Sequence, residues 1–408
     1  MNEHDGLHEA LQHTLRLHPW YEDLLKEHGI RLPAAGGIRL EELPLMTAET
    51  LERFYYSQSP REEPGLSVYR TSGTSTGVRK AIYYSEEDDI RYVEAKTASF
   101  RGWLRGSLSG GRALADLGTG HAASTALRIF DELGMEGEAI DFASPIEQHI
   151  RKLLDFRPDL LYTMPSILEA IAHAEPDPRS FGLKRIILVG EIASAAWQAN
   201  IAARFGLRRR DLLDTYGSIE IGAMAAYDHD LGMYVLADGL YGEALPAERI
   251  DGGLEPLRAD EGVLVLTSTV RKLFPAIRFV TYDVVRDFGI RVCGGKARYV
   301  FSGIVKRIGK ELKHGEKISL YDIEEAVSRH VKDAAVRVMA RDNRLTVFVG
   351  SRHADDAMLQ AVRRELEISI AEIGKMIEGG LLRGIEVIRL EDAARLPSGT
   401  VKSKKIYP

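Results

Sequence analysis

The chain has 408 residues, 45% of them hydrophobic and 28% charged, which is the composition of an ordinary globular protein with room for more than one domain. A formal net charge of -6 gives no basic field for phosphate backbones or anionic lipid, which argues against nucleic acid and membranes as partners. The one cysteine, Cys293, excludes an intrachain disulfide, and a polar N-terminus without any long apolar segment predicts a cytoplasmic protein.

The first hundred residues predict a helical cap followed by a hairpin. Apolar residues recur at helical spacing over 7–25, and Pro19 divides this segment into two short helices. The stretch 66–84 predicts two strands around a loop of serine, threonine and glycine. Ser85 with Asp88 then predicts a capping box that opens a helix, so the loop should be held at both ends.

Strand and helix patterns alternate between residues 112 and 216, which predicts right-handed parallel crossovers and an α/β sheet with ligands at its carboxyl edge. Residues 233–301 become β-rich and glycine-punctuated, as expected of an antiparallel or barrel-like region that closes the same domain. The remainder predicts a basic stretch, a helix, a strand, a long helix, a strand and a lysine-rich tail. We therefore expect a large N-terminal α/β domain, 1–303, and a small mobile α+β domain, 304–408.

The first motif is the serine, threonine and glycine loop at 71–80. Its backbone amides and hydroxyls can surround phosphate oxygens, while Arg79 or Lys80 supplies positive charge. The spacing is not that of a Walker A loop. Considered alone, such a run is more often a solvated connection than a nucleotide site.

The second motif is Tyr216-Gly217-Ser218-Ile219-Glu220, at the end of an expected strand. It offers an aromatic face for a purine and a carboxylate for a divalent cation. Considered alone, the pattern favours a turn with a core tyrosine and a solvated glutamate.

Taken in order, these two motifs, Asp283 and a C-terminal lysine resemble the adenylate-forming enzyme superfamily, and most closely its phenylacetate-CoA ligase branch. The resemblance spans about residues 69 to 405. Further matches are Thr163-Met164-Pro165-Ser166, Gly190-Glu191, and the run Pro275-Ala276-Ile277-Arg278-Phe279-Val280-Thr281-Tyr282-Asp283. The resemblance implies ATP-dependent activation of a carboxylic acid as an acyl-AMP.

The resemblance also implies a role for each matched position. The ATP phosphates would be held by Thr71, Ser72, Gly73, Thr74, Ser75, Thr76, Gly77 and Lys80. Adenine and ribose would be held by Gly190, Glu191, Tyr216, Gly217 and Asp283. Glu220 would bind magnesium. An ionised Asp283 can accept hydrogen bonds from two ribose hydroxyls, and a turn aspartate is its structural alternative.

The catalytic residue that the resemblance implies is Lys402, in the tail segment Leu396-Pro397-Ser398-Gly399-Thr400-Val401-Lys402. The family has glycine before this lysine where the chain has Val401, and Lys404 and Lys405 follow closely. The choice among the three lysines is therefore open, as is a solvated basic tail.

Two segments are expected to line the acid pocket. His121 follows a glycine-rich turn after an expected strand and is a candidate for the carboxylate or thiol site, although a structural histidine is equally compatible. Ser218, Gly222 and Ala223 belong to the second motif and the apolar run after it. An apolar wall favours an aryl or aliphatic acid over a charged one.

Three functions remain open. The first is an acid-CoA ligase that uses ATP, Mg2+ and CoA, and the second passes the acyl group to a carrier protein, a protein or an amine. The third is an adenylate-binding protein that has lost turnover. The acidic hinge residue expected ahead of Gly315-x-x-Ile318 is replaced near Ile308 and Gly309, which favours the second function. Relatives of this branch are often dimers, so a homodimer is a candidate assembly.

Overall fold

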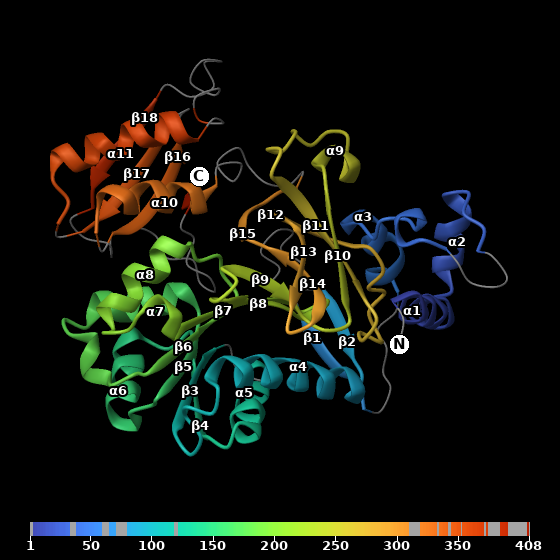
Figure 1. Cartoon of the computed structure of the whole chain (residues 1–408), viewed down its shortest axis with the longest axis horizontal. Helices are drawn as coiled ribbons and strands as arrows, with labels where there is room; N and C mark the ends of the chain where they lie inside the picture. The colour runs from blue at the N-terminus through green and yellow to red at the C-terminus, as the bar shows by residue number, and fades with distance from the viewer. Residues whose placement is uncertain are drawn as a thin grey trace. The chain divides into compact units, whose positions relative to one another are not determined.

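The structure is a computed structural model, shown in Figure 1. It describes residues 3–32, 38–58, 65–70, 80–117, 121–309, 319–332, 334–341, 344–351, 353–370, 373, 384–390 and 406–407. The chain forms two compact units, Met1–Gly102 with Thr215–Gly303, and Trp103–Asp214 with Ile304–Pro408. We call these the first unit and the second unit. Within the described ranges, no helix is both long and apolar enough to cross a bilayer.

The N-terminal part of the first unit is helical, as the sequence predicts. Helices α1 (Glu3–Leu17) and α2 (Trp20–Glu27) are separated at Pro19, which lacks the N–H that a continuous helix requires. The short helix α3 (Ala48–Leu51) begins at the N-cap Thr47, whose side chain accepts from the amide of Thr50.

A β-hairpin and a long helix follow, and both were expected. Strands β1 (Ser67–Arg70) and β2 (Ala81–Tyr84) pair antiparallel. Helix α4 (Glu86–Leu104) opens with the predicted capping box: the Ser85 amide donates to the Asp88 carboxylate, and the Asp88 amide donates to the Ser85 hydroxyl, both at 3.1 Å. This box fixes the direction in which the chain leaves the hairpin.

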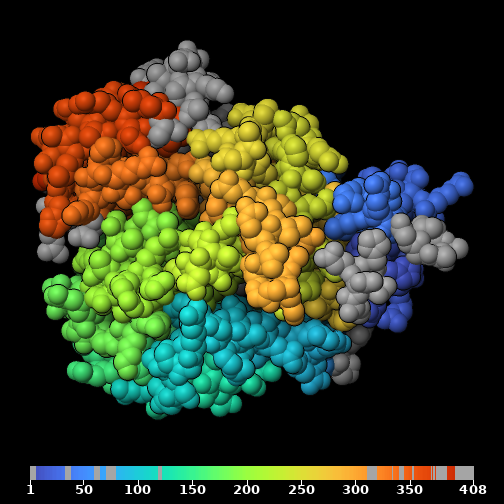
Figure 2. Space-filling view, in the orientation of Figure 1, coloured from blue at the N-terminus to red at the C-terminus, as the bar shows by residue number. Residues whose placement is uncertain are grey.

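Antiparallel strands make up the rest of the first unit and confirm the β-rich region. One group has the order β13-β14-β9-β8 and another the order β10-β11-β12. Their bounds are β8 (Gly222–Asp228), β9 (Met233–Leu236), β10 (Leu240–Leu245), β11 (Glu261–Ser268), β12 (Phe279–Arg286), β13 (Gly289–Cys293) and β14 (Lys296–Phe301), with α9 (Ala247–Ile250) after β10. Figure 2 shows the β13–β14 hairpin at the surface, where Val292 is 75% exposed.

The second unit contains the predicted parallel sheet. Its elements in chain order are β3 (Arg112–Leu117), α5 (His121–Glu132), β4 (Glu136–Asp141), α6 (Ile146–Phe156), β5 (Leu160–Thr163), α7 (Pro165–Ala174), β6 (Arg185–Leu188) and α8 (Ala195–Arg204). The strand order is β4-β3-β5-β6, and all pairs are parallel. Strand β7 (Leu212–Ser218) begins beside β6 and ends in the first unit, where it pairs antiparallel with β8.

Helices α6, α7 and α8 bury apolar side chains against this sheet. Leu161 of β5, Ile186 of β6 and Leu212 of β7 belong to the same buried cluster as Leu168 of α7 and Ile201 of α8. All four residues of β5 are buried, as expected of a parallel strand covered on both faces. This buried core therefore fixes the positions of the carboxyl ends of these strands.

The C-terminal part of the second unit is a four-stranded sheet with two helices. Its elements are α10 (Leu320–His330), β16 (Ala335–Arg341), β17 (Arg344–Gly350), α11 (Asp356–Ser369), β18 (Ile385–Arg389) and β19 (Ile406–Tyr407), and β15 (Gly303–Arg307) precedes them. The strand order is β18-β17-β16-β19, and buried side chains from both helices form a separate core. The expected fold class is thereby confirmed, while the domain boundary at 303/304 stays a prediction.

Candidate active site

The end of strand β7 brings together two residues expected to bind the nucleotide. The Tyr216 hydroxyl donates to Oδ2 of Asp283 on β12 at 2.5 Å. The Asp283 amide donates to the Thr281 hydroxyl at 3.1 Å, and the residue between them, Tyr282, has a φ of +62°. A positive φ at a tyrosine is unusual and such strain gathers at functional sites. The structure thus brings Tyr216 and Asp283 into contact, while their shared role in binding a nucleotide stays a prediction.

The turn between β7 and β8 carries Glu220 and is tightly packed. A Cβ at Gly217 would lie 2.7 Å from the Gly222 carbonyl oxygen, so only glycine fits there. Gly222 has a φ of +95°, and a Cβ there would lie 3.1 Å from the Tyr92 ring. The Ser218 hydroxyl accepts from the Ile221 amide at 3.2 Å and closes the turn. The predicted pocket residues Ser218, Gly222 and Ala223 thus lie on one turn and the strand after it.

Lys80 stands at the start of the exit strand of the expected phosphate loop. Its ammonium pairs with Glu52 and lies 4.9 Å above the centre of the Tyr56 ring. To bind a phosphate, the Lys80 ammonium would therefore exchange the Glu52 carboxylate for a phosphate oxygen. The remaining expected phosphate ligands, Thr71, Ser72, Gly73, Thr74, Ser75, Thr76 and Gly77, lie outside the described residues, as does Lys402.

In the second unit, Gly190 and Glu191 follow strand β6 as expected. Gly190 has a φ of +84°, and the Glu191 carboxylate accepts from both the amide and the hydroxyl of Ser166, each at 2.8 Å. This carboxylate therefore neutralises the positive end of α7. His121 is the first residue of α5, and its side chain lies outside the described residues.

Sequence reasoning missed the residues that support the Glu220 turn. Arg271, whose side chain is 3% exposed, donates to the Asp88 carboxylate at 2.5 Å, the Tyr83 carbonyl at 2.6 Å and the Glu220 carbonyl at 3.0 Å. The hydroxyl of Tyr84 donates to the Ile219 carbonyl at 2.8 Å. Burial raises the pKa of Tyr84, so its hydroxyl stays protonated and remains a donor. No sequence motif marks this set beyond the Ser85 capping box.

A buried histidine and aspartate in the second unit were also missed. His149 Nδ1 lies 2.7 Å from Asp116 Oδ2, Nε2 lies 3.0 Å from the Ser144 carbonyl oxygen, and both side chains are 1% exposed. Burial lowers the pKa of His149, but the hydrogen bond and charge of Asp116 outweigh it and hold that pKa above its ordinary value. Because the carbonyl can only accept, Nε2 carries a hydrogen and a second proton sits in the bond to Asp116.

The C-terminal part of the second unit contacts α7 and α8 through charged side chains. Glu324 and Glu325 of α10 accept from the amides of Ser194 and Ala196 at the start of α8, at 3.4 and 3.1 Å. Arg337 of β16 pairs with Glu169 of α7 at 2.5 Å. The carboxylates of Glu324 and Glu325 complement the positive end of α8.

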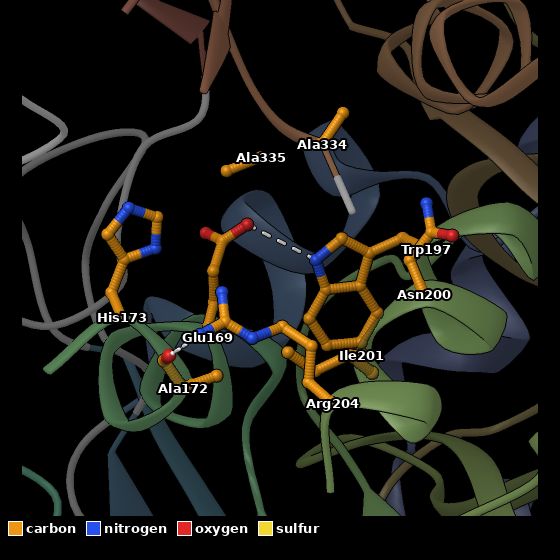
Figure 3. Close-up of a pocket in the computed structure, with 9 residues that line it drawn as sticks. All are labelled: Glu169, Ala172, His173, Trp197, Asn200, Ile201, Arg204, Ala334 and Ala335. Carbon is orange, nitrogen blue, oxygen red and sulfur yellow. Dashed lines mark hydrogen bonds between the residues drawn. The ribbon is translucent and has the colours of Figure 1, made fainter. Parts of the chain in front are cut away.

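A small cavity of about 30 Å³ lies at this contact, lined by α7, α8 and residues 334–335. Figure 3 shows the Glu169 carboxylate in it, accepting from the Trp197 indole at 3.2 Å. The space is enough for about two water molecules and too small for an organic substrate.

Magnesium fits the first-unit site as far as the described residues define it. No cluster of three or more acidic, histidine or cysteine ligands occurs among them. Mg2+ typically takes one or two carboxylates and completes its shell with water and substrate phosphates. Glu220 is partly exposed, and its carboxylate makes no hydrogen bond or ion pair within the described ranges. A single carboxylate on a held turn suits that mode of binding.

The fold is that of acyl-activating enzymes. The structure matches 2-hydroxyisobutyryl-CoA ligase in its postadenylation state with a TM-score of 0.72 at 17% identity, over 97% of this chain and 86% of that one. In sequence, the chain is 36% identical over 404 residues to fumarate--(S)-2,3-diaminopropanoate ligase from Enterobacter agglomerans, which covers 99% of each protein.

The chain therefore belongs to the adenylate-forming ligases and is an enzyme of that superfamily. Residues 313–391 match the family model of the fumarate--diaminopropanoate ligase C-terminal domain. Phenylacetate-coenzyme A ligase from Aromatoleum evansii is 27% identical over 241 residues, 56% of this chain and 51% of that protein. The resemblance expected from the motifs is confirmed.

Proposed function

We propose that this enzyme activates a small dicarboxylic acid of the fumarate type as an acyl-AMP and transfers the acyl group to the amine of a small amino acid. The observation that carries the proposal is the similarity to fumarate--(S)-2,3-diaminopropanoate ligase, which extends through 99% of both chains. The match of residues 313–391 to the C-terminal domain of the same kind of ligase agrees with it. The product would be an amide.

CoA as the acceptor is the second candidate. It is favoured by the partial similarity to phenylacetate-coenzyme A ligase, which extends through 56% of this chain. The amine acceptor ranks first because fumarate--(S)-2,3-diaminopropanoate ligase matches this chain at higher identity and over the full length. It also agrees with the altered hinge sequence near Ile308 and Gly309.

The reaction has two steps. A carboxylate oxygen of the acid attacks the α-phosphorus of ATP, a new phosphorus–oxygen bond forms, and the bond to pyrophosphate breaks. The amine nitrogen then attacks the acyl carbon, the carbon–nitrogen bond forms, the bond to AMP breaks, and the nitrogen loses a proton. No protein nucleophile is required, so the contribution of the protein is positioning and charge neutralisation.

Separate residues of this chain bind the nucleotide and neutralise its charge. Asp283 accepts hydrogen bonds from the ribose hydroxyls, and Tyr216 orients the Asp283 carboxylate through the 2.5 Å hydrogen bond. Glu220 would hold Mg2+, which would supply positive charge beside the phosphates. Lys402 of the tail stabilises the reacting oxygens, and the amides of the 71–80 loop hold the phosphates.

The proposed acid differs from the one that the sequence favoured. The apolar residues after Glu220 predicted an aryl or aliphatic acid, and the fumarate-type acid carries a second carboxylate. That carboxylate requires a cation or several donors in the pocket, because a buried unpaired charge is costly.

The test is pyrophosphate release from ATP and Mg2+ with fumarate, succinate, phenylacetate and acetate, each with (S)-2,3-diaminopropanoate, with CoA or with neither. We expect release with fumarate, faster when the diamine is present, and an amide with the combined mass of acid and amine less one water. Acceleration by CoA and a thioester product would replace the amine with the second candidate. The variant Glu220→Gln serves as the control for metal-dependent turnover.

A further inference from the structure

The turn that carries Glu220 is held in place through its own main-chain carbonyls. Those of Ile219 and Glu220 accept hydrogen bonds from Tyr84 and Arg271, at 2.8 and 3.0 Å. Both carbonyls belong to the turn between β7 and β8, and both donors are buried side chains that lie far from it in sequence. The Glu220 carboxylate takes no part in these two bonds.

The same two donors are attached to strand β2, which is the exit strand of the expected phosphate loop. Tyr84 is the last residue of β2, and Arg271 donates to the carbonyl of Tyr83 beside it at 2.6 Å. The Arg271 guanidinium also lies 3.7 Å above the centre of the Tyr84 ring. The two side chains therefore join β2 to the Glu220 turn as one packed unit.

Asp88 keeps Arg271 in place. Its side chain is 0% exposed and accepts from the Arg271 guanidinium at 2.5 Å. It also accepts from the amides of Ser85, Lys272 and Leu273, at 3.1, 2.7 and 3.2 Å. A guanidinium holds its donors in a fixed plane, so with Nη1 on Asp88 its Nε and Nη2 are aimed at the carbonyls of Glu220 and Tyr83.

From this geometry we infer that Arg271 and Tyr84 are positioning residues, which fix the distance between the Glu220 turn and the exit strand of the phosphate loop. The inference rests on the proposed role of Glu220 as the magnesium ligand. Mg2+ joins a protein carboxylate to substrate phosphates and tolerates little deviation from octahedral geometry. A turn free to shift against β2 would bind the metal with ATP less tightly, without any change in the reacting groups.

The variant Tyr84→Phe tests the inference with a small change. It removes one hydroxyl donor and keeps the ring beneath Arg271. One hydrogen bond of this kind changes a local equilibrium by about fivefold. We expect amide hydrogen exchange in residues 218–222 of the ligand-free protein to rise by about that factor. We also expect the Mg2+ concentration that half-maximally enhances ATP binding, measured by calorimetry, to rise similarly, with turnover at saturating Mg2+ close to wild type.

The matched control is Tyr69→Phe. The Tyr69 hydroxyl donates to Asp89 at the same 2.8 Å distance, and this variant removes that bond. The Tyr69 ring packs edge-on against the Tyr84 ring, with 4.8 Å between the ring centres. Asp89 lies on α4 and not on the Glu220 turn, so exchange in 218–222 and the Mg2+ dependence should stay at wild-type values.

A second variant, Arg271→Lys, keeps the charge beside Asp88 and loses the fork. It should reproduce the shift in Mg2+ dependence.

Unchanged exchange and unchanged Mg2+ dependence in Tyr84→Phe would overturn the inference, as would an equal shift in Tyr69→Phe. A wild-type protein that releases no pyrophosphate with any acid would overturn the proposed function instead, while the exchange measurement would still decide whether the turn is held.

Discussion

Replacing Arg337 with methionine should lower the free energy of unfolding by about 3 kcal/mol, the lower end of the range for breaking a buried ion pair. Arg337 and Glu169 approach to 2.5 Å, with side chains 12% and 7% exposed, so the pair is largely desolvated. Methionine keeps most of the volume but removes the positive charge from beside a buried carboxylate. The remaining exposure of Arg337 places the loss at the lower end of that range.

Urea denaturation followed by tryptophan fluorescence measures the effect. The double variant Glu169→Gln with Arg337→Met removes both charges and keeps an acceptor for the Trp197 indole, so it should recover about 2 kcal/mol of the loss. Arg329→Met is the control, because Arg329 pairs with Glu365 at 2.5 Å with side chains 59% and 28% exposed. That loss should stay below about 1 kcal/mol. A loss for Arg337→Met as small as the control, or a double variant no more stable than the single, would refute the reasoning.

Four further predictions concern the site and its supports. Asp283→Asn should raise the KM for ATP by about tenfold or more, since hydrogen bonds to charged groups contribute about 1.5–3 kcal/mol, and an unchanged KM would remove this residue from the ribose site. Gly217→Ala should destabilise the protein by about 1–3 kcal/mol in thermal or urea unfolding, because its Cβ would lie 2.7 Å from the Gly222 oxygen. The pKa of His149 is raised in the folded state, so His149 stabilises the protein fully below its ordinary pKa of 6.5, and this stabilisation is lost as the pH rises through the raised pKa. His149→Gln should therefore flatten the decline in the free energy of unfolding over that pH range. Lys402→Ala should slow acyl-AMP formation at least about 100-fold in single-turnover assays, and an equal rate would transfer the role to a later tail lysine.

Local pattern was enough to predict most of the fold. The alternation of strands and helices from β3 to β6 has strong periodicity, and burial of β5 on both faces follows from its unbroken apolar run. The weakest helix signal in this range is that of α8, because its segment, AAWQANIAAR, is rich in alanine and has no clear apolar stripe. Its N-cap, Ser194, which accepts from the Trp197 amide at 3.1 Å, was the available signal.

The candidate site was predictable where a motif is contiguous. Tyr216 and Glu220 share one short run, and Asp283 was associated with them only by resemblance to a family. The supports were not predictable, because Arg271 and Asp88 are 183 positions apart and no periodicity links them. Asp116 and His149, 33 positions apart, likewise meet only once the sheet has formed.

The contact of Glu324 and Glu325 with the first turn of α8 has a consequence for anions. The free amides at a helix N-terminus form a site that attracts negative groups, and here two side-chain carboxylates occupy it. A sulfate or phosphate at this end of α8 would have to compete with the carboxylates of Glu324 and Glu325 for the same amides. High concentrations of such anions should therefore act as competitors of this contact, and buffers of phosphate and of chloride at equal ionic strength should affect it differently.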